Sequence, residues 1–230
     1  MKTTNAPFSA TAAVLLLCSA PAFAQVPAQQ DTAQDTAQDD AMLSVFGRVA
    51  PLNDAQTTMQ DPHGEVRIVP FADRLEIAVY ARGLEPGMHR TLVYGFPGDR
   101  PREARCPTQS ADINEDGWVD LAEARLVAGE ALIPLTADTV SLSYDSAYFP
   151  EAGTWGVADF ETLARLDELR EALRERHGTP LALARRVVLI HGVAEGTELP
   201  RTVYAPEGLS AQEAVPVACA ELDPSDERPL

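Results

Sequence analysis

Residues 74–84, with the sequence RLEIAVYARGL, constrain the fold most, because large apolar side chains recur at every second position. Leu75, Ile77 and Val79 occupy one row, and residues such as Glu76 occupy the opposite row. A period of two is typical of a β-strand that turns one face to a core and the other to solvent. The segment therefore predicts a sheet with one buried face.

Other segments have a similar composition and are separated by turn signals. The predicted strands are MLSVFGRV, EVRIVPF, HRTLVYGF, EALIPLTA, ALARRVVLIHGV and AVPVACAEL. LAEARLVAG favours a short helix that ends at Gly129, and a leucine stripe predicts a helix over about residues 158–177, which ends at Gly178. The stripe consists of Phe160, Leu163, Leu166, Leu169 and Leu173. Because strands outnumber helices, we predict a mainly β protein, an antiparallel sandwich or barrel with a helical insertion at about residues 107–180.

The N-terminus has the pattern of an export signal. In residues 1–24, Lys2 precedes a short apolar run, and the small-residue sequence AFA precedes a predicted cleavage point. Residues 25–41 repeat the unit DTAQ and contain almost no large apolar side chain, which predicts a disordered acidic linker. Residues 42–222 have the length of one domain, and 223–230 form a tail. We therefore expect a periplasmic or secreted protein without membrane insertion.

Two cysteines remain after the predicted cleavage. Cys18 lies in the signal segment, so Cys106 and Cys219 are left as an even pair. In an oxidising compartment such a pair most simply forms a disulfide. The alternative is two buried free thiols.

The charge balance limits the classes of partner. Lys2 is the only lysine among 18 basic residues, so the exported chain has 17 arginines against 35 acidic residues, a formal balance of −18. Such a surface repels nucleic acid and anionic lipid, whereas divalent cations suit it. Much of this acidity also serves to keep an exported protein soluble.

Residues 112–123, DINEDGWVDLAE, match the twelve-residue calcium loop of EF-hand proteins. Calcium prefers hard oxygen ligands, which such a loop supplies from fixed positions around a central glycine, here Gly117. The predicted ligands are Asp112, Asn114, Asp116, Trp118, Asp120 and Glu123. Trp118 would supply its carbonyl, Asp120 would act through a water molecule, and Glu123 would bind through both oxygens. The next residue after Trp118, Val119, is apolar and suits an anchor to a core or to a partner loop.

An acidic turn that caps a helix without metal is the alternative, since Asp120 can also cap the helix predicted after it. The segment before the loop, PREARCPTQSA, contains prolines where an EF-hand has its entering helix. Only one such loop is present in the sequence, whereas regulatory sensors pair them. These features favour a structural calcium site over a switch.

The blocks GLEPGMHRTLVYGFPGD, RRVVLIHG and PVACAEL resemble the exported copper/zinc superoxide dismutase family and its relatives, which include CHRD domains. The resemblance covers about residues 65–106 and 183–222. It implies a Greek-key β-sandwich and a disulfide that joins a loop to the last strand, which the pair Cys106 and Cys219 matches. In that family a turn histidine precedes a strand with two copper-binding histidines, and a late strand supplies another.

Carried over residue by residue, the resemblance argues against bound copper or zinc. His89 matches the turn histidine, which is not a copper ligand in the family. The two copper positions fall on Leu92 and Tyr94, which cannot replace imidazoles. His191 matches the late ligand, and the histidine-rich zinc loop has no counterpart. A single histidine on an apolar strand is more often a hydrogen-bonded core residue than a metal ligand.

Together these observations predict an exported calcium-binding protein with a structural or interaction role and no catalytic residues. The alternative is a divergent copper/zinc superoxide dismutase-like enzyme. The sequence contains no phosphate-binding glycine loop, no HExxH and no G-x-S-x-G, so other enzyme classes find no support. The predicted partner is the calcium ion, and the sequence specifies no protein partner.

Overall fold

The computed structural model describes residues 43–53, 61–145 and 148–225. The predicted signal peptide, the predicted linker and residues 226–230 lie outside them. The strands are β1 (Val45–Pro51), β2 (His63–Pro70), β3 (Arg74–Arg82), β4 (Gly87–Met88), β5 (Thr91–Gly95), β6 (Glu130–Pro134), β7 (Glu151–Ala152), β8 (Val157–Arg165), β9 (Val187–His191), β10 (Pro216–Glu221) and β11 (Asp223–Pro224). The helices are α2 (Leu121–Ala128), α3 (Leu166–His177) and α4 (Ala211–Ala214), with 3-10 turns η2 (Gln109–Ala111) and η3 (Leu183–Arg185).

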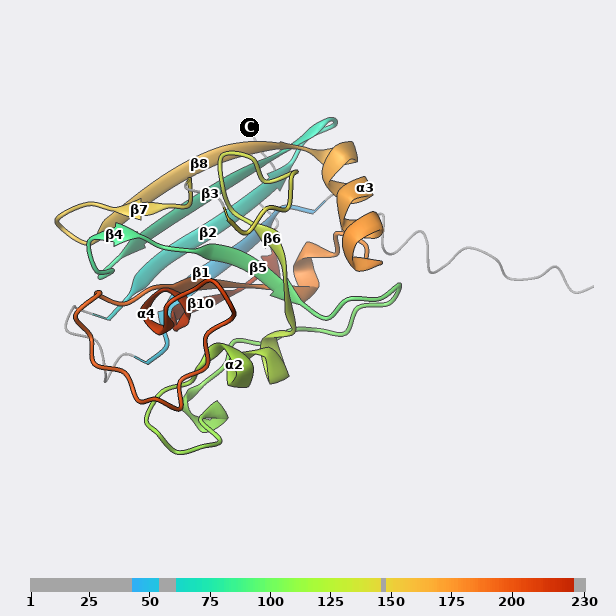
Figure 1. The fold of residues 1–230 in the computed structure, drawn as a ribbon. Coiled ribbons are helices and arrows are strands. Elements are labelled where there is room, and N and C mark those ends of the chain that lie inside the picture. The colour runs from blue at the N-terminus through green and yellow to red at the C-terminus, as the bar shows by residue number, and fades with distance from the viewer. Residues whose placement is uncertain (1–42, 54–60, 146–147, 226–230) are drawn as a thin grey trace, which may run out of the picture. The chain divides into compact units, whose positions relative to one another are not determined.

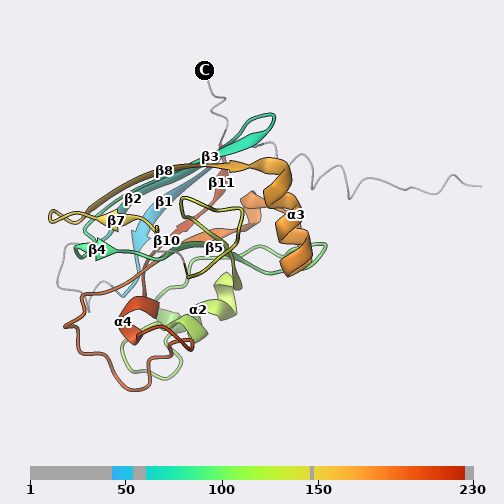
Figure 2. The same cartoon turned by 45° about the horizontal axis from the view of Figure 1, so that its top comes forward.

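All strands of the described residues belong to one curled antiparallel sheet (Figures 1 and 2). The strand order is β4-β7-β8-β3-β2-β1-β10-β9-β5-β6, and β11 pairs with β1 at the side. The curl occurs along β1, whose first part pairs with β2 and whose last residues, Ala50 and Pro51, pair with β10. The predicted mainly β, antiparallel class is confirmed.

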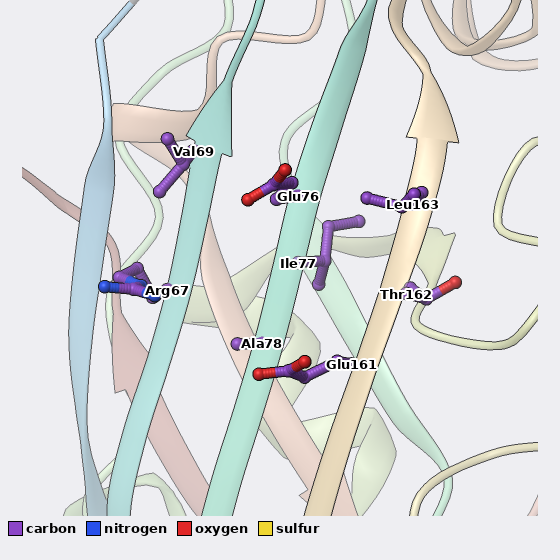
Figure 3. A pocket seen from close by; sticks show the side chains of 8 residues that line it. All are labelled: Arg67, Val69, Glu76, Ile77, Ala78, Glu161, Thr162 and Leu163. Atoms are coloured by element: carbon purple, nitrogen blue, oxygen red, sulfur yellow. The ribbon is translucent and has the colours of Figure 1, made fainter. Parts of the chain in front are cut away.

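The alternation predicted for residues 74–84 is confirmed in β3. Leu75, Ile77 and Val79 are about 1% exposed and belong to the main core, where they lie beside the inner residues of β2 and β8. The opposite row meets solvent, and Figure 3 shows Arg67, Glu76 and Glu161 on three neighbouring strands, where they line a hollow of about 330 Å³. An antiparallel sheet with one solvated face has this pattern.

The strands β5 and β9 are instead buried on both faces. On their outer side Leu92, Tyr94 and Leu189 belong to a second core cluster, together with Val119 and Leu121 of the loop and helix that cover them. Figure 1 shows α2 on this side of the sheet, below β5. The uninterrupted apolar run of β9 follows from this double burial.

The helix predicted over residues 158–177 is wrong in its first half. Residues 157–165 form β8, which pairs with β3 along its whole length, and only Leu166–His177 is helical. In β8 the apolar residues follow the period of a strand, so Ala158 and Ala164 are buried while Leu163 is 60% exposed. Pairing with β3 overrides the helical leucine spacing, because tertiary context decides such ambiguous segments.

The stretch 107–180, expected as an insertion, contributes strands to the sheet itself. The strand β8 lies between β7 and β3, and β6 forms one end of the strand order beside β5. The part from η2 to α2 lies outside the sheet and carries the acidic loop, and α3 lies outside it as well. Among the described residues, no helix is long and apolar enough to cross a membrane.

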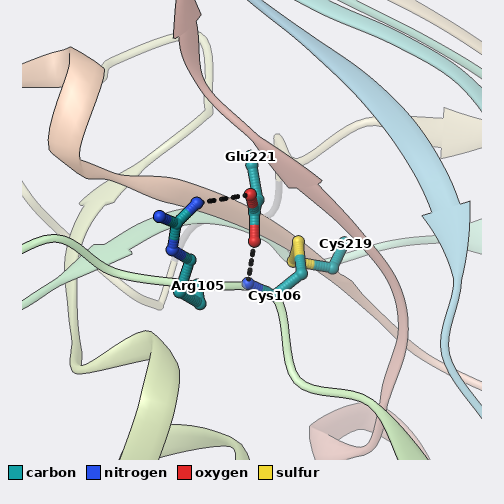
Figure 4. The surroundings of a disulfide bond; sticks show 4 residues. All are labelled: Arg105, Cys106, Cys219 and Glu221. Atoms are coloured by element: carbon teal, nitrogen blue, oxygen red, sulfur yellow. Dashed lines mark hydrogen bonds and ion pairs between the residues drawn. A yellow bond between two sulfur atoms is a disulfide. The ribbon is translucent and has the colours of Figure 1, made fainter.

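The predicted disulfide between Cys106 and Cys219 is confirmed, with 5.7 Å between the two Cα atoms. It joins the segment before the acidic loop to β10 (Figure 4). The Glu221 carboxylate reinforces this connection, since it accepts a hydrogen bond of 2.9 Å from the Cys106 amide and pairs with Arg105 at 3.2 Å. The disulfide thus holds the chain beside the sheet just before the loop begins.

We expect the double substitution Cys106→Ala and Cys219→Ala to lower the free energy of unfolding by about 4 to 5 kcal/mol, because a bridge across about 110 residues restricts the unfolded chain strongly. Urea unfolding of the exported protein measures this loss. Reduction of the wild type should give a similar loss. Two titratable thiols in the native exported chain would contradict the disulfide.

The division between β8 and α3 is tested by two leucine truncations. Leu169→Ala, in α3, removes a fully buried side chain and should cost about 2 to 5 kcal/mol of unfolding free energy. Leu163→Ala, in β8, should change it by about 0.5 kcal/mol or less, because Leu163 faces solvent. Similar losses at both positions would favour one continuous helix.

Candidate metal site

The acidic loop runs from η2 into the first turn of α2. Asp120 is the N-cap of α2 and accepts the Glu123 amide at 3.0 Å, while the Glu123 carboxylate accepts the Asp120 amide at 3.0 Å. This reciprocal pair is a capping box. The helix ends at Gly129, as the sequence predicts. The predicted cap at Asp120 is therefore confirmed.

The first half of the loop turns its polar side chains inward. The Asp116 amide donates to Asp112 Oδ1 at 3.1 Å and to Asn114 Oδ1 at 2.9 Å, and the Gly117 amide donates to Asp112 Oδ2 at 2.9 Å. The chain reverses through left-handed conformations at Glu115, with φ of 58°, and at Gly117, with φ of 93°. Gly117 adopts its value without cost, which explains a glycine at this point.

Glu123 closes the loop on itself. Its Oε1 accepts hydrogen bonds from the amides of Ile113 at 2.8 Å and Asn114 at 3.2 Å, in addition to the capping bond through Oε2. The residue is only 7% exposed. Glu123, the last predicted ligand, therefore contacts the first residues of the loop.

Asp116 and Asp120 attach the loop to a segment that is distant in sequence. Asp120 Oδ2 accepts the Tyr204 amide at 2.7 Å, and Asp116 Oδ2 accepts the Thr202 hydroxyl. Asp120 is 2% exposed and Tyr204 is 43% exposed, so their bond lies at the edge of the buried region. Nothing in the sequence pattern signals the contribution of Thr202 and Tyr204.

One buried amide side chain joins the loop to the sheet. The Val119 amide donates to Asn53 Oδ1 at 2.7 Å, and Asn53 Nδ2 donates to the carbonyls of Val119 at 3.0 Å and Pro216 at 2.9 Å. Val119 is fully buried, so it is the anchor that its position suggested. Its neighbour Trp118 is also buried and belongs to the main core. The sequence pattern does not identify Asn53 as a residue that holds the loop. Its one signal is its place at the end of a strand, where the chain turns. Asparagine tolerates the left-handed conformation that it adopts there, with φ of 60°.

The ligand atoms are of the kind that calcium prefers, but the carboxylates do not converge. Among the described residues, no three or more His, Cys, Asp or Glu side chains are grouped so that they could hold a metal ion. In the loop the side-chain oxygens of Asp112, Asn114 and Glu123 accept backbone amides instead. The Oδ1 atoms of Asp112 and Asn114 each accept one amide and keep a second lone pair, whereas Glu123 Oε1 already accepts two amides. The residues fit calcium in kind and order, and binding requires the carboxylates to turn further inward.

His191, the residual match to a copper ligand, is held by two hydrogen bonds. Its Nδ1 donates to the Ala214 carbonyl at 2.7 Å, and its Nε2 accepts the Tyr94 hydroxyl at 3.1 Å. His191 is 2% exposed, and its burial lowers its pKa to about 4. His89 bridges the carbonyls of Glu85 and His191 at 2.7 and 2.9 Å. Both imidazoles are thus used for structure, and Leu92 packs in the second core cluster.

No family model matches the chain, and no curated protein matches it significantly. The resemblance to the superoxide dismutase family therefore stays a prediction that rests on the quoted sequence blocks.

The buried His191 makes a specific prediction for acid stability. The folded pKa lies below the ordinary value of 6.5, so the unfolded state gains this proton first. Above a pH of about 6.5, the neutral imidazole makes its full contribution to the free energy of unfolding. This contribution falls by about 3 kcal/mol as the pH decreases toward 4. Urea unfolding between pH 7 and pH 4 should show this loss, and His191→Gln should reduce it. His63→Gln, at an exposed position, should keep the wild-type dependence; an unchanged dependence in His191→Gln would refute the assignment.

Proposed function

We propose that this chain is an exported calcium-binding protein, in which residues 112–123 hold a calcium ion with a structural or interaction role. The observation that carries the proposal is the inward arrangement of the loop: the oxygens of Asp112 and Asn114 surround the Asp116 amide, and Glu123 reaches back to the start of the loop. A loop with the EF-hand order of ligands, whose last ligand already lies against its first residues, can surround an ion once its carboxylates turn inward.

The charge of the loop supports a cation. Asp112, Asp116, Asp120 and Glu123 lie within twelve residues of each other, and like charges at this spacing repel. Backbone amides offset part of this repulsion, because each donates to a carboxylate oxygen. When bound, calcium supplies the positive charge that amide dipoles provide only in part, while the chain's own residues orient the oxygens.

The expected consequence of binding is local order. Asp116 and Asp120 also accept hydrogen bonds from Thr202 and Tyr204, so the loop connects α2 to the segment that follows β9. An ion in the loop would therefore stabilise the layer that covers β5 and β9. This is a structural role, and it agrees with the presence of one such loop in the sequence.

Export is part of the proposal. The disulfide between Cys106 and Cys219 supports it, because structural disulfides persist in oxidising compartments. A dismutase-like Greek-key identity is likewise proposed on the sequence blocks alone. Among the described residues nothing favours the enzyme alternative, since both nitrogens of His191 are hydrogen-bonded.

Calcium titration tests the proposal. For a dissociation constant of about 1 mM, typical of extracellular sites, about 10 mM calcium stabilises the fold by about 1.4 kcal/mol, which raises the melting temperature by about 3 to 6 °C. Terbium should also show sensitised luminescence, because Trp118 lies within the loop. Glu123→Gln should remove both effects, since it removes the charge of the closing ligand.

The matched control is Glu115→Gln, an exposed carboxylate of the same loop at a position that supplies no predicted ligand. It should keep both the calcium effect and the luminescence. A wild-type protein without terbium signal and without a calcium-dependent melting temperature would refute calcium binding. If Glu123→Gln and Glu115→Gln lost the calcium effect and the luminescence equally, the loop would attract cations only through its total negative charge.

A further inference from the structure

A cavity of about 520 Å³ lies beside α2, separate from the acidic loop. Tyr94 and His191, both buried, are among its lining residues, as are Leu121 and Arg125 of α2. Other lining residues come from β5 and β6, from the residues around Tyr144, from the end of α3, from residues 206–209 and from α4. Its volume is in the range of sites for small molecules.

Arg125 gives this cavity an unsatisfied donor. Its Nε is the one buried side-chain nitrogen or oxygen without a hydrogen-bond partner in the described part of the chain. Its one described ion-pair partner is Glu130 Oε2, which lies 3.5 Å from this Nε on a side chain that is 57% exposed. Buried donors in proteins nearly always have a hydrogen bond, so a guanidinium nitrogen with only this distant ion pair can still donate to an acceptor on a ligand in the cavity.

A second guanidinium lies near the same place. Arg90 is half-buried, donates to the Tyr144 carbonyl and stacks over the Phe149 ring, 5.1 Å from its centroid. Its burial lowers its pKa, and the carboxylates of Glu213 and Asp145 partly oppose that effect. Burial raises the pKa of the Tyr94 hydroxyl, and Arg125 and Arg90 partly oppose that effect, so both cations lie near Tyr94.

The acidic residues that line the cavity are all exposed. They are Glu130, Asp145, Glu207 and Glu213, whereas Arg90 and Arg125 are partly buried. Partly buried positive charge beside exposed negative charge favours a ligand with one negative group and disfavours multiply charged anions. Leucine side chains supply an apolar surface for the rest of the ligand; they are Leu92, Leu121 and Leu209.

We propose that this cavity binds a small organic carboxylate. The carboxylate group pairs with Arg125 and Arg90, because a planar guanidinium matches a carboxylate through two parallel hydrogen bonds. The apolar part of the ligand packs against the leucines and the Tyr144 ring. This inference does not depend on calcium binding, since neither arginine contacts the acidic loop through a described hydrogen bond.

Benzoate is a suitable probe, with benzyl alcohol as its neutral counterpart. Titration of the full exported protein, followed by NMR or calorimetry in chelator and again in calcium, should show saturable benzoate binding under both conditions. Benzyl alcohol should bind at least about tenfold more weakly, because it lacks the charge. No saturable benzoate binding, or equal affinity for the two compounds, would overturn the proposal.

Variants locate the site. Arg125→Gln should weaken benzoate binding at least about tenfold, while Arg174→Gln, an exposed arginine of α3 outside the cavity, should leave it unchanged. Leu209→Trp should block the cavity from a partly exposed position without removing a charge, so it serves even if Arg125→Gln does not fold. Benzoate affinity that survives both Arg125→Gln and Leu209→Trp would place binding elsewhere and refute the site.

Discussion

The three hydrogen bonds of the Asn53 carboxamide join the acidic loop to two strands of the sheet. Its amide connects the end of β1, the carbonyl of Pro216 at the start of β10, and the backbone of Val119 in the middle of the acidic loop. All these groups are buried, and a buried polar group left without a partner costs about 1 to 3 kcal/mol. Asn53 thus fixes the centre of the loop over the sheet, while the disulfide between Cys106 and Cys219 holds the chain just before the loop.

The attachment at Val119 explains how a highly acidic loop can be part of a packed structure. Trp118 belongs to the main core and Val119 to the second cluster, so the loop is fixed between two cores at its centre. Its carboxylates then lie where backbone amides can reach them, and Glu123 and Asp120 serve at once as helix cap and as loop closure. A calcium ion would add to an arrangement that the backbone already supports, which is why we infer a structural site and not a switch.

The sequence predicted those elements whose signals are local. The alternation of β3, the capping of α2 by Asp120 and its end at Gly129 each depend on neighbouring residues, and each is confirmed. The boundary between β8 and α3 could not be predicted, because Leu163 fits a helical stripe and a strand equally well until β3 pairs with it. Asn53, Thr202 and the arginines of the cavity act across long sequence separations, and a single sequence carries no pattern for such contacts.

One hydrogen bond fixes the protonation state of His191, which lines the cavity beside α2. The Tyr94 hydroxyl donates to His191 Nε2, so this nitrogen already has a partner. The bond stabilises the neutral imidazole, because a protonated Nε2 could not accept it, and burial acts in the same direction. Arg90 and Arg125 line the same cavity and also lower the pKa of His191, because a second positive charge beside them is unfavourable. The Tyr94 hydroxyl, the neutral imidazole and the two guanidinium groups are therefore parts of one electrostatic arrangement.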